Sequence, residues 1–433
     1  MTPSVLRGFR DYLPPDAGAR SEIRRRMRAV ARRAGYVELE TPSVESFELY
    51  QRKSGEGIAA EAWMFSDKGG RPVALVPETT PSLARVFAER AKSEPLPVKW
   101  FTVSKCWRYE EPQAGRTREF LQFNLDLIGV PGVEAEADLL ATASQMMDEV
   151  GAEGLYAFRI SDRDIAAGIG RLFGATDSPR FFRAVDRYRK IPASEFEAEL
   201  EAAGVVRDRA KELSELFLSA GHGVPPDGVG AYLDGLVSRG LDAAARGGID
   251  RSRTLFALLD RAGLADRVVF DPTIVRGLAY YTGTVFEAYA KRDGGRAVFG
   301  GGRYDHLMEL FEAPPTPAAG LAIGDQTLEL LLRGADRWPE GEPMLDAYVV
   351  TVDAKFLGDA LALVQEIRRA GRSADCDLLA RSMSRQLKEA ARRRARTALI
   401  LGLKEAKPGA IVERDLESGA QREIPRSEAA RRA

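Results

Sequence analysis

Two long strand-like segments joined by a polar loop constrain the fold of this chain more than any other feature. Residues 98–109 and 119–129 have the alternation and the β-branched and aromatic content of strands, and residues 110–118 between them include proline and glycine. This pattern predicts a large antiparallel hairpin. Hairpin loops are usually only about two to five residues long, so a loop of this length is expected to be functional.

The size and composition of the chain indicate a globular protein with more than one domain. With 433 residues, and a prior of roughly 150 residues per domain, two or three domains are expected. Hydrophobic residues make up 45% and charged residues 29%, which excludes a disordered or collagen-like chain. There is no run of about 18 apolar residues, so no membrane span is expected. The first residues lack the apolar stretch of a signal peptide, which favours a cytoplasmic location.

Several common kinds of site are absent from the sequence. Cys106 and Cys376 lie far apart, and His222 and His306 are the only histidines, so neither a disulfide framework nor a transition-metal site is expected. There is no GxxxxGK[ST] and no GxGxxG pattern, which excludes a P-loop and the dinucleotide-binding fingerprint.

The charge of the chain is unevenly distributed. The net charge is −1, but residues 344–433 hold 18 lysines and arginines against 13 aspartates and glutamates, a balance of +5. The preceding residues hold 45 against 51, a balance of −6. A basic C-terminal segment is compatible with contact to a polyanion there, and equally with an ordinary solvated helix face.

The order of the predicted elements divides the chain into three parts. Helical periodicity dominates residues 163–264, where no good strand pattern occurs, while strand patterns return afterwards and a linker follows at 334–344. The last residues alternate strand and helix, which predicts a small α/β domain with a largely parallel sheet. Outside these regions the pattern predicts helices at 18–34, 81–92, 133–150 and 326–333 and strands at 36–41, 71–76, 157–161, 267–270, 284–289 and 297–299.

The hairpin carries a row of polar residues and a group of arginines. Gln122, Asn124 and Asp126 alternate with apolar residues, so they share one face of their strand, where burial is costly unless they bind something. Arg108 and Arg116 lie on or beside the loop, and an arginine fork binds phosphate through two hydrogen bonds. A phosphate site is therefore indicated, with a surface ion-pair network as the alternative.

Three further clusters are candidate ligand loops, each with a simpler alternative. Residues 275–284 contain Arg276, Tyr280 and Tyr281. This segment is either a ligand-binding loop or an ordinary turn with aromatic packing. Residues 300–305 follow a predicted strand with three glycines, which allow close approach of the backbone to a ligand. Residues 77–80 place Glu78 and Thr80 before a helix, where an ordinary N-cap would also fit.

Taken together, these segments resemble those of histidyl-tRNA synthetases, a family of class II aminoacyl-tRNA synthetases, over essentially the whole chain. The matching segments are the N-terminal signature at 7–11, motif 1 at 35–42, motif 2 at 107–129, the histidine motif at 274–281, the GGRYD segment at 300–305, and the start of motif 3 at 320–324. The resemblance implies an α+β fold with a class II synthetase catalytic core on a mainly antiparallel sheet. The implied domains are the catalytic domain at 1–162 and 265–333, a helical insertion at 163–264, and a C-terminal α/β anticodon-binding domain at 345–433.

The resemblance also implies an activity, ATP-dependent charging of tRNA(His) with L-histidine through a histidyl-adenylate, by a cytoplasmic homodimer that uses Mg²⁺ and has no protein metal site. Arg108 and Arg276 are the implied catalytic residues, and Gln113 is expected to contact the tRNA acceptor end. The implied ATP-binding residues are Arg108, Glu110 and Arg116. The implied histidine-binding residues are Glu78, Thr80, Gln122, Asp126, Arg276, Tyr280, Tyr281 and Tyr304.

The chain departs from the family pattern at three positions, and two other functions compete. Thr327 replaces the arginine of motif 3, and Gln326 replaces a glutamate, so either Arg116 or Arg303 compensates or ATP binding is weak. Ala279 stands where an acidic residue is common. The alternatives are an inactive regulatory subunit of ATP phosphoribosyltransferase and a module that senses tRNA or histidine.

Overall fold

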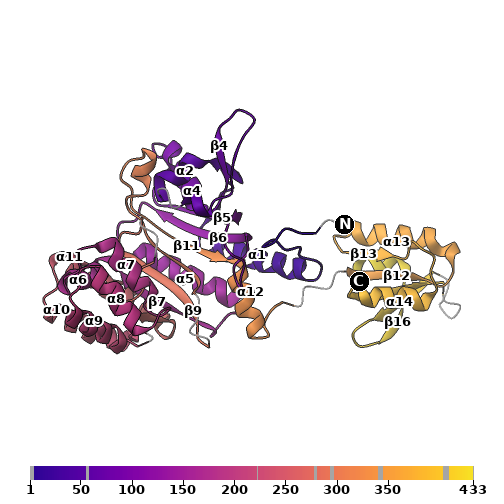
Figure 1. The fold of residues 1–433 in the computed structure, drawn as a ribbon. Helices are drawn as coiled ribbons and strands as arrows, with labels where there is room; N and C mark the ends of the chain where they lie inside the picture. The colour runs from indigo at the N-terminus through magenta and orange to yellow at the C-terminus, as the bar shows by residue number, and fades with distance from the viewer. Residues whose placement is uncertain are drawn as a thin grey trace. The chain divides into compact units, whose positions relative to one another are not determined.

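Figure 1 shows a computed structural model of the chain, which describes residues 4–54, 58–221, 223–276, 280–292, 297–339, 345–402 and 409–432. His222 and Ala279 lie outside the described residues. The chain forms two units, one of Met1–Tyr12 and Ile23–Trp338 and one of Leu13–Glu22 and Pro339–Ala433. No helix in the described parts is long and apolar enough to cross a membrane.

The first unit is built on an eight-stranded sheet that is mainly antiparallel. Only the outermost pairs, β1 with β5 and β7 with β8, are parallel. The predicted sheet of the catalytic core is therefore confirmed. In spatial order the strands are β1 (Val37–Glu38), β5 (Val98–Trp107), β6 (Glu119–Ile128), β11 (Ala318–Gly324), β10 (Ala297–Arg303), β9 (Thr284–Ala290), β7 (Tyr156–Asp162) and β8 (Val268–Phe270).

The predicted hairpin is the longest strand pair of this sheet. Strands β5 and β6 pair without a break from Val98 opposite Ile128 to Trp107 opposite Glu119. On β6 the alternating residues Phe123, Leu125 and Leu127 are buried in the main hydrophobic core, so the residues between them face the opposite side of the sheet.

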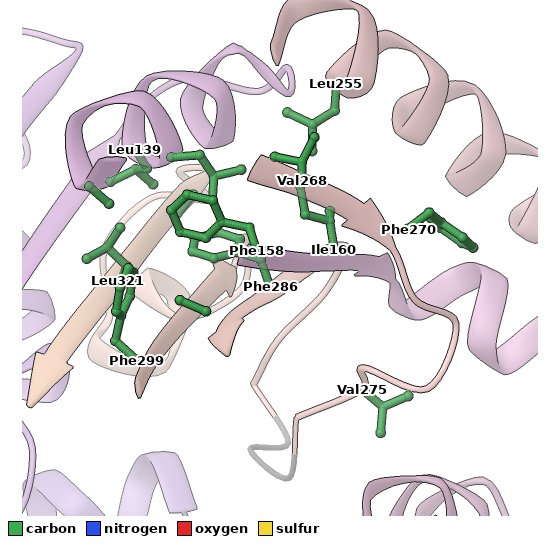
Figure 2. Packing of buried hydrophobic residues seen from close by; sticks show 14 of the residues in the cluster. Leu139, Phe158, Ile160, Leu255, Val268, Phe270, Val275, Phe286, Phe299 and Leu321 are labelled. Atoms are coloured by element: carbon green, nitrogen blue, oxygen red, sulfur yellow. The ribbon is translucent and has the colours of Figure 1, made fainter. Parts of the chain in front are cut away.

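The main core lies between the sheet and the helices that cover this face. Figure 2 shows Phe158, Phe286 and Leu321 from three strands packed with Leu139 of helix α5 (Glu134–Glu149) and Leu255 of helix α11 (Ala243–Arg261). The N-terminal helix α1 (Asp16–Arg33) adds Ile23, Met27 and Val30 to the same cluster at helical spacing.

A small module covers part of the other face of the sheet. Its core joins Phe47, Tyr50 and Phe87 to Trp100 of β5 and Tyr304. Strands β2 and β3 were not predicted, because each has only three residues and no buried residue that would create a pattern. The module consists of β2 (Val44–Ser46), β3 (Met64–Ser66), β4 (Pro72–Leu75), α2 (Phe47–Ser54), α3 (Ile58–Glu61) and α4 (Thr80–Arg90).

The predicted helical segment contains no strand within its described residues. Three of its helices begin at aspartates, Asp162, Asp177 and Asp242, whose side chains accept hydrogen bonds from backbone amides of the first turn. Its apolar residues belong to the same buried cluster as the sheet, and its treatment as a separate domain stays a prediction. Besides α11 it holds α6 (Arg163–Leu172), α7 (Ser178–Arg187), α8 (Ala193–Ala202), α9 (Arg207–Ser219) and α10 (Pro226–Ser238).

The second unit has a five-stranded sheet that is only partly parallel. Strands β12 (Leu345–Thr351), β13 (Ala374–Cys376) and β14 (Ala395–Leu401) are parallel, whereas β15 (Ala410–Asp415) and β16 (Gln421–Pro425) continue the sheet antiparallel. Strands β15 and β16 were not predicted. Strand β16 buries only Ile424 and so lacks an apolar face. The helices of this unit are α13 (Leu357–Arg369), α14 (Met383–Arg392) and α15 (Arg426–Arg432).

Candidate active site

The polar residues of β6 face a strip of sheet that has almost no side chains. The pairing of β6 with β11 sets Asn124 opposite Ala322 and Asp126 opposite Gly320. The pairing of β11 with β10 then sets Gly300 opposite Ala322 and Gly302 opposite Gly320. Directly paired residues share a face, so the polar row of β6 borders a floor made of backbone.

The glycines of this floor are required because side chains of neighbouring segments lie directly against them. A Cβ atom at Gly302 would lie 2.9 Å from the Tyr281 ring, and one at Gly320 would lie 2.6 Å from the Asp126 carboxylate. A Cβ atom at Gly300 would overlap the Arg276 guanidinium. The predicted end of the preceding strand at residue 299 is therefore wrong, since the glycines lie inside β10 and are needed there for space.

Arg276 is half-buried beside this floor, with its side chain 19% exposed, and is held from several sides. Its guanidinium lies 3.3 Å from the Glu287 carboxylate and 5.5 Å from the centre of the Tyr281 ring. Burial alone would lower its pKa, but Tyr281 and Glu287 keep the pKa above the ordinary value, so the charge persists. The backbone has a positive φ of 50°, a strained conformation for a residue with a side chain.

An arginine of the helical segment fixes the loop that carries Arg276. The Arg163 guanidinium donates to the carbonyl oxygens of Val275 and Arg276, at 3.0 and 3.1 Å, and lies 4.3 Å from the ring centre of Phe182 on α7. The strained loop is therefore tied by hydrogen bonds to the helical segment.

Three tyrosines form an aromatic group beside the polar row. The ring centres of Tyr280 and Tyr281 are 4.5 Å apart, and that of Tyr304 lies 5.8 Å from Tyr280. The Tyr304 hydroxyl donates to the Asp126 carboxylate. Burial raises the pKa of Tyr280 and Tyr304 well above the ordinary value, with Tyr281 and Glu78 adding to the effect at Tyr280 and Asp126 at Tyr304. Both hydroxyls thus remain hydrogen-bond donors at neutral pH.

Residues 77–80 lead from β4 into α4. Glu78 is buried, and its charge acts on Tyr280, while Thr80 is the first residue of the helix. Thr79 occupies the N-cap position without a side-chain hydrogen bond to the helix. A simple capping role for this segment is therefore not supported.

Arg108, Glu110 and Arg116, on or beside the hairpin loop, line one cavity of about 270 Å³. Arg108 donates to the carbonyl oxygen of Pro77 at 3.1 Å, and the Glu110 carboxylate lies 3.1 Å from the Arg116 guanidinium. The structure thus brings together predicted residues from the hairpin and from the Arg276 loop, namely Arg108, Glu110, Arg116, Gln122 and Arg276.

Family models that match this chain cover the segments that form the site. The family model described as histidyl-tRNA synthetase matches residues 8–328, which include the hairpin, the Arg276 loop and the glycine strand. The chain belongs to the histidyl-tRNA synthetase family. A second family model, described as an anticodon-binding domain, matches residues 346–432. The predicted family is thereby confirmed.

Curated relatives and solved structures agree with this membership of the histidyl-tRNA synthetase family. The histidine–tRNA ligase of Natronomonas pharaonis is 38% identical over 97% of this chain and 95% of its own length. The chloroplastic/mitochondrial histidine–tRNA ligase of Arabidopsis thaliana is 33% identical over 98% and 85%. The histidyl-tRNA synthetase of Nostoc sp. PCC 7120 has the same fold, with a TM-score of 0.84 and 23% identity over both full chains. The regulatory alternative is less supported by these relatives.

At the departures from the synthetase family pattern, the structure excludes one suggested compensation. The Thr327 hydroxyl donates to the Val298 carbonyl at 2.6 Å, and the Gln326 amide donates to the Tyr12 hydroxyl at 2.6 Å. Arg303 faces the opposite side of the sheet, where its guanidinium is buried against Glu136 at 2.6 and 2.8 Å. The suggestion that Arg303 replaces the motif 3 arginine is therefore wrong, whereas Arg116 lines the cavity.

Two residues of the candidate site were missed or left out of the predicted set. Glu287 pairs with Arg276 and accepts a hydrogen bond from Tyr289 at 2.7 Å. It lies in a predicted strand, and its only signal was a charged residue among apolar neighbours. Asn124 is only 2% exposed, and neither of its amide atoms has a hydrogen-bond partner among the described residues. Gln113 lines a neighbouring cavity instead of this one.

Proposed function

We propose that the protein attaches L-histidine to tRNA(His) in two steps, in the cavity formed by the hairpin and the Arg276 loop. A carboxylate oxygen of histidine attacks the α-phosphorus of ATP, and the bond to the β-phosphate breaks, which yields histidyl-adenylate and pyrophosphate. A terminal ribose hydroxyl of the tRNA then attacks the acyl carbon and releases AMP. The observation that carries this proposal is that Arg108 and Arg276 line the same cavity.

The histidine side chain would lie above the backbone floor, beside Asp126. A carboxylate there would accept the imidazole N–H and distinguish histidine from side chains that have no N–H to donate. The hydroxyl of Tyr304 holds Asp126 in place. Glu78, Thr80 and Gln122 would bind the amino group and the main-chain part of the amino acid, close to Tyr280 and Tyr281.

The first step needs alignment and positive charge more than a protein nucleophile. Arg108 and Arg276 would bind the α-phosphate as negative charge develops on it, and Glu110 and Arg116 would bind the adenine and phosphate parts of ATP. In the described parts of the chain there is no cluster of three metal-ligating side chains. A Mg²⁺ ion would bind mainly through phosphate oxygens, with Glu110 and Glu287 as the nearby carboxylates, and would neutralise phosphate charge.

The proposed function also requires contacts with tRNA outside the cavity. Gln113, on the hairpin loop, would contact the acceptor end of the tRNA, and the second unit, which matches an anticodon-binding domain, would contact the anticodon. We further propose a homodimer, on the basis of the motif 1 segment at 35–42, and a cytoplasmic location, where tRNA charging takes place.

Histidine-dependent exchange of pyrophosphate into ATP tests the proposed function, followed by charging of total tRNA. Exchange that requires histidine and no other amino acid is expected. Absence of exchange with every amino acid would contradict the proposal and favour the regulatory or sensor function, whereas exchange without charging would restrict the activity to the first step.

Replacing Asn124 with alanine is expected to raise the KM for histidine about tenfold while leaving stability nearly unchanged. A buried amide without partners costs free energy in the empty protein, and a ligand that bonds to it recovers that cost. Thr102, directly opposite on β5, is also buried with its hydroxyl unpaired among the described residues. Thr102→Val is the matched control, because it removes a polar atom from the same row one strand further from the floor.

Pyrophosphate exchange at varied histidine concentration, together with thermal unfolding, measures both effects. An unchanged KM for histidine in Asn124→Ala would remove this residue from the binding site. A large loss of stability would instead show that Asn124 has a structural role.

A further inference from the structure

A second and larger cavity adjoins the catalytic one. Its volume is about 750 Å³, and it shares Gly115, Ala297, Val298 and Thr327 with the cavity of about 270 Å³. Pockets for small ligands usually measure about 300–1,000 Å³, so the catalytic cavity by itself is small for histidine and ATP together. The larger cavity offers room, past Thr327, for the part of a nucleotide that does not fit beside Arg108 and Arg276.

The charged residues that line the larger cavity are all cations. They are Lys291, Arg292 and Arg337, and no carboxylate is found among the described residues of its wall. Arg337 is held in place, since it donates to the carbonyl oxygens of Gly151 and Glu153 at 3.0 and 2.7 Å. A cavity with this charge favours an anionic ligand.

Lys291 and Arg292 enter the cavity from the end of β9. The backbone amide of Lys291 donates to the Leu155 carbonyl at 2.8 Å, which fixes the chain where it leaves the strand. Both side chains are exposed, and within the described chain neither has an ion pair. Their charges are therefore available to a ligand.

The wall between the two cavities lacks the charge that the family pattern places there. Thr327 is neutral, and its hydroxyl is already bonded to the Val298 carbonyl. The charge of Arg116, the nearest cation of the hairpin loop, is partly countered by Glu110 at 3.1 Å. Arg303 points away from the site, so the cations that border Thr327 from the other side are Lys291, Arg292 and Arg337. Of these, Arg337 already donates to two backbone carbonyls.

We propose that Lys291 and Arg292 bind the terminal phosphates of ATP, and the pyrophosphate that leaves, in place of the missing motif 3 arginine. The proposal rests on the proposed function. An arginine offers a planar fork to phosphate oxygens and a lysine a compact point charge, so the pair supplies both kinds of contact. Because both side chains are exposed, their effect weakens as salt concentration rises.

The double variant Lys291→Ala/Arg292→Ala tests the proposal by histidine-dependent pyrophosphate exchange. The KM values for ATP and for pyrophosphate are expected to rise about tenfold, because each exposed charge contributes only a modest free energy of binding. The KM for histidine is expected to stay unchanged. The double variant Lys211→Ala/Arg183→Ala is the matched control, because it removes two exposed cations from the helical segment. Adding Thr327→Arg to the first double variant is expected to lower the KM for ATP again.

Other outcomes would overturn the proposal. Unchanged KM values for ATP and pyrophosphate would do so, and so would a defect that Thr327→Arg does not reduce. A raised KM for tRNA in charging, with exchange unaffected, would assign the cavity to the acceptor end of the tRNA. If the unmodified protein shows no histidine-dependent exchange, the proposed function fails first, which separates the two results.

Discussion

Replacing Arg276 with alanine is expected to slow histidine-dependent pyrophosphate exchange by on the order of 10²-fold or more. Removing one preorganised donor to developing charge costs about this factor in other enzymes, roughly 3 kcal/mol of transition-state stabilisation. Arg276 fits such a role because it is largely shielded from solvent, keeps its charge, and sits on a strained backbone over Gly300. The loss is expected in kcat, because the α-phosphate gains charge in the transition state.

The variant Arg276→Lys separates charge from geometry. It keeps a cation but loses the planar fork, so partial recovery of exchange is expected. Alanine, lysine and arginine all have a Cβ atom, so the positive φ affects the three chains alike. Exchange close to that of the unmodified protein in Arg276→Ala would remove this residue from the chemistry.

Replacing Glu136 with alanine is expected to destabilise the first unit by about 3–5 kcal/mol. Arg303 is 2% exposed, and its guanidinium makes two hydrogen bonds to the Glu136 carboxylate, at 2.6 and 2.8 Å. Removing one partner of a buried ion pair leaves the other charge without compensation in a medium that solvates it poorly. Asp305 and two carbonyl oxygens remain beside Arg303 and offset only part of this cost.

Denaturant unfolding followed by tryptophan fluorescence measures this effect in the intact protein. All four tryptophans, Trp63, Trp100, Trp107 and Trp338, belong to the first unit, so the signal reports on that unit. Glu134→Ala is the matched control, since it removes an exposed carboxylate from the same turn of α5 and should cost less than about 1 kcal/mol. Equal losses in the two variants would contradict the role of the buried pair.

The sequence predicted the face of β6 but not that of β10, and the reason lies in the residues. In β6, polar and apolar side chains alternate from Gln122 to Leu127, so the pattern identifies both faces. In β10, three glycines precede Arg303, and because glycine has no side chain the pattern did not show which way the arginine points. The wrong suggestion that Arg303 serves ATP followed from that gap.

Other parts of the site required either the fold or the family resemblance. Glu287 could not be recognised from its strand alone, because its partner Arg276 lies on a loop eleven residues earlier in the chain and meets it only in the folded protein. The roles expected for Glu78, Thr80 and Gln113 come from the resemblance and stay predictions. The row formed by Gln122, Asn124 and Asp126, by contrast, followed from alternation alone.

The backbone floor has a consequence for how this protein can diverge. Substitutions in the surrounding walls change one side chain at a time and can tune affinity in small steps. Inserting or deleting one residue in β10 would shift its register and turn Phe299, Gly301 and Arg303 toward the ligand. The shape of the pocket therefore depends on the register of β10. Related proteins can vary the side chains of the pocket walls, but they must keep the number of residues in this strand.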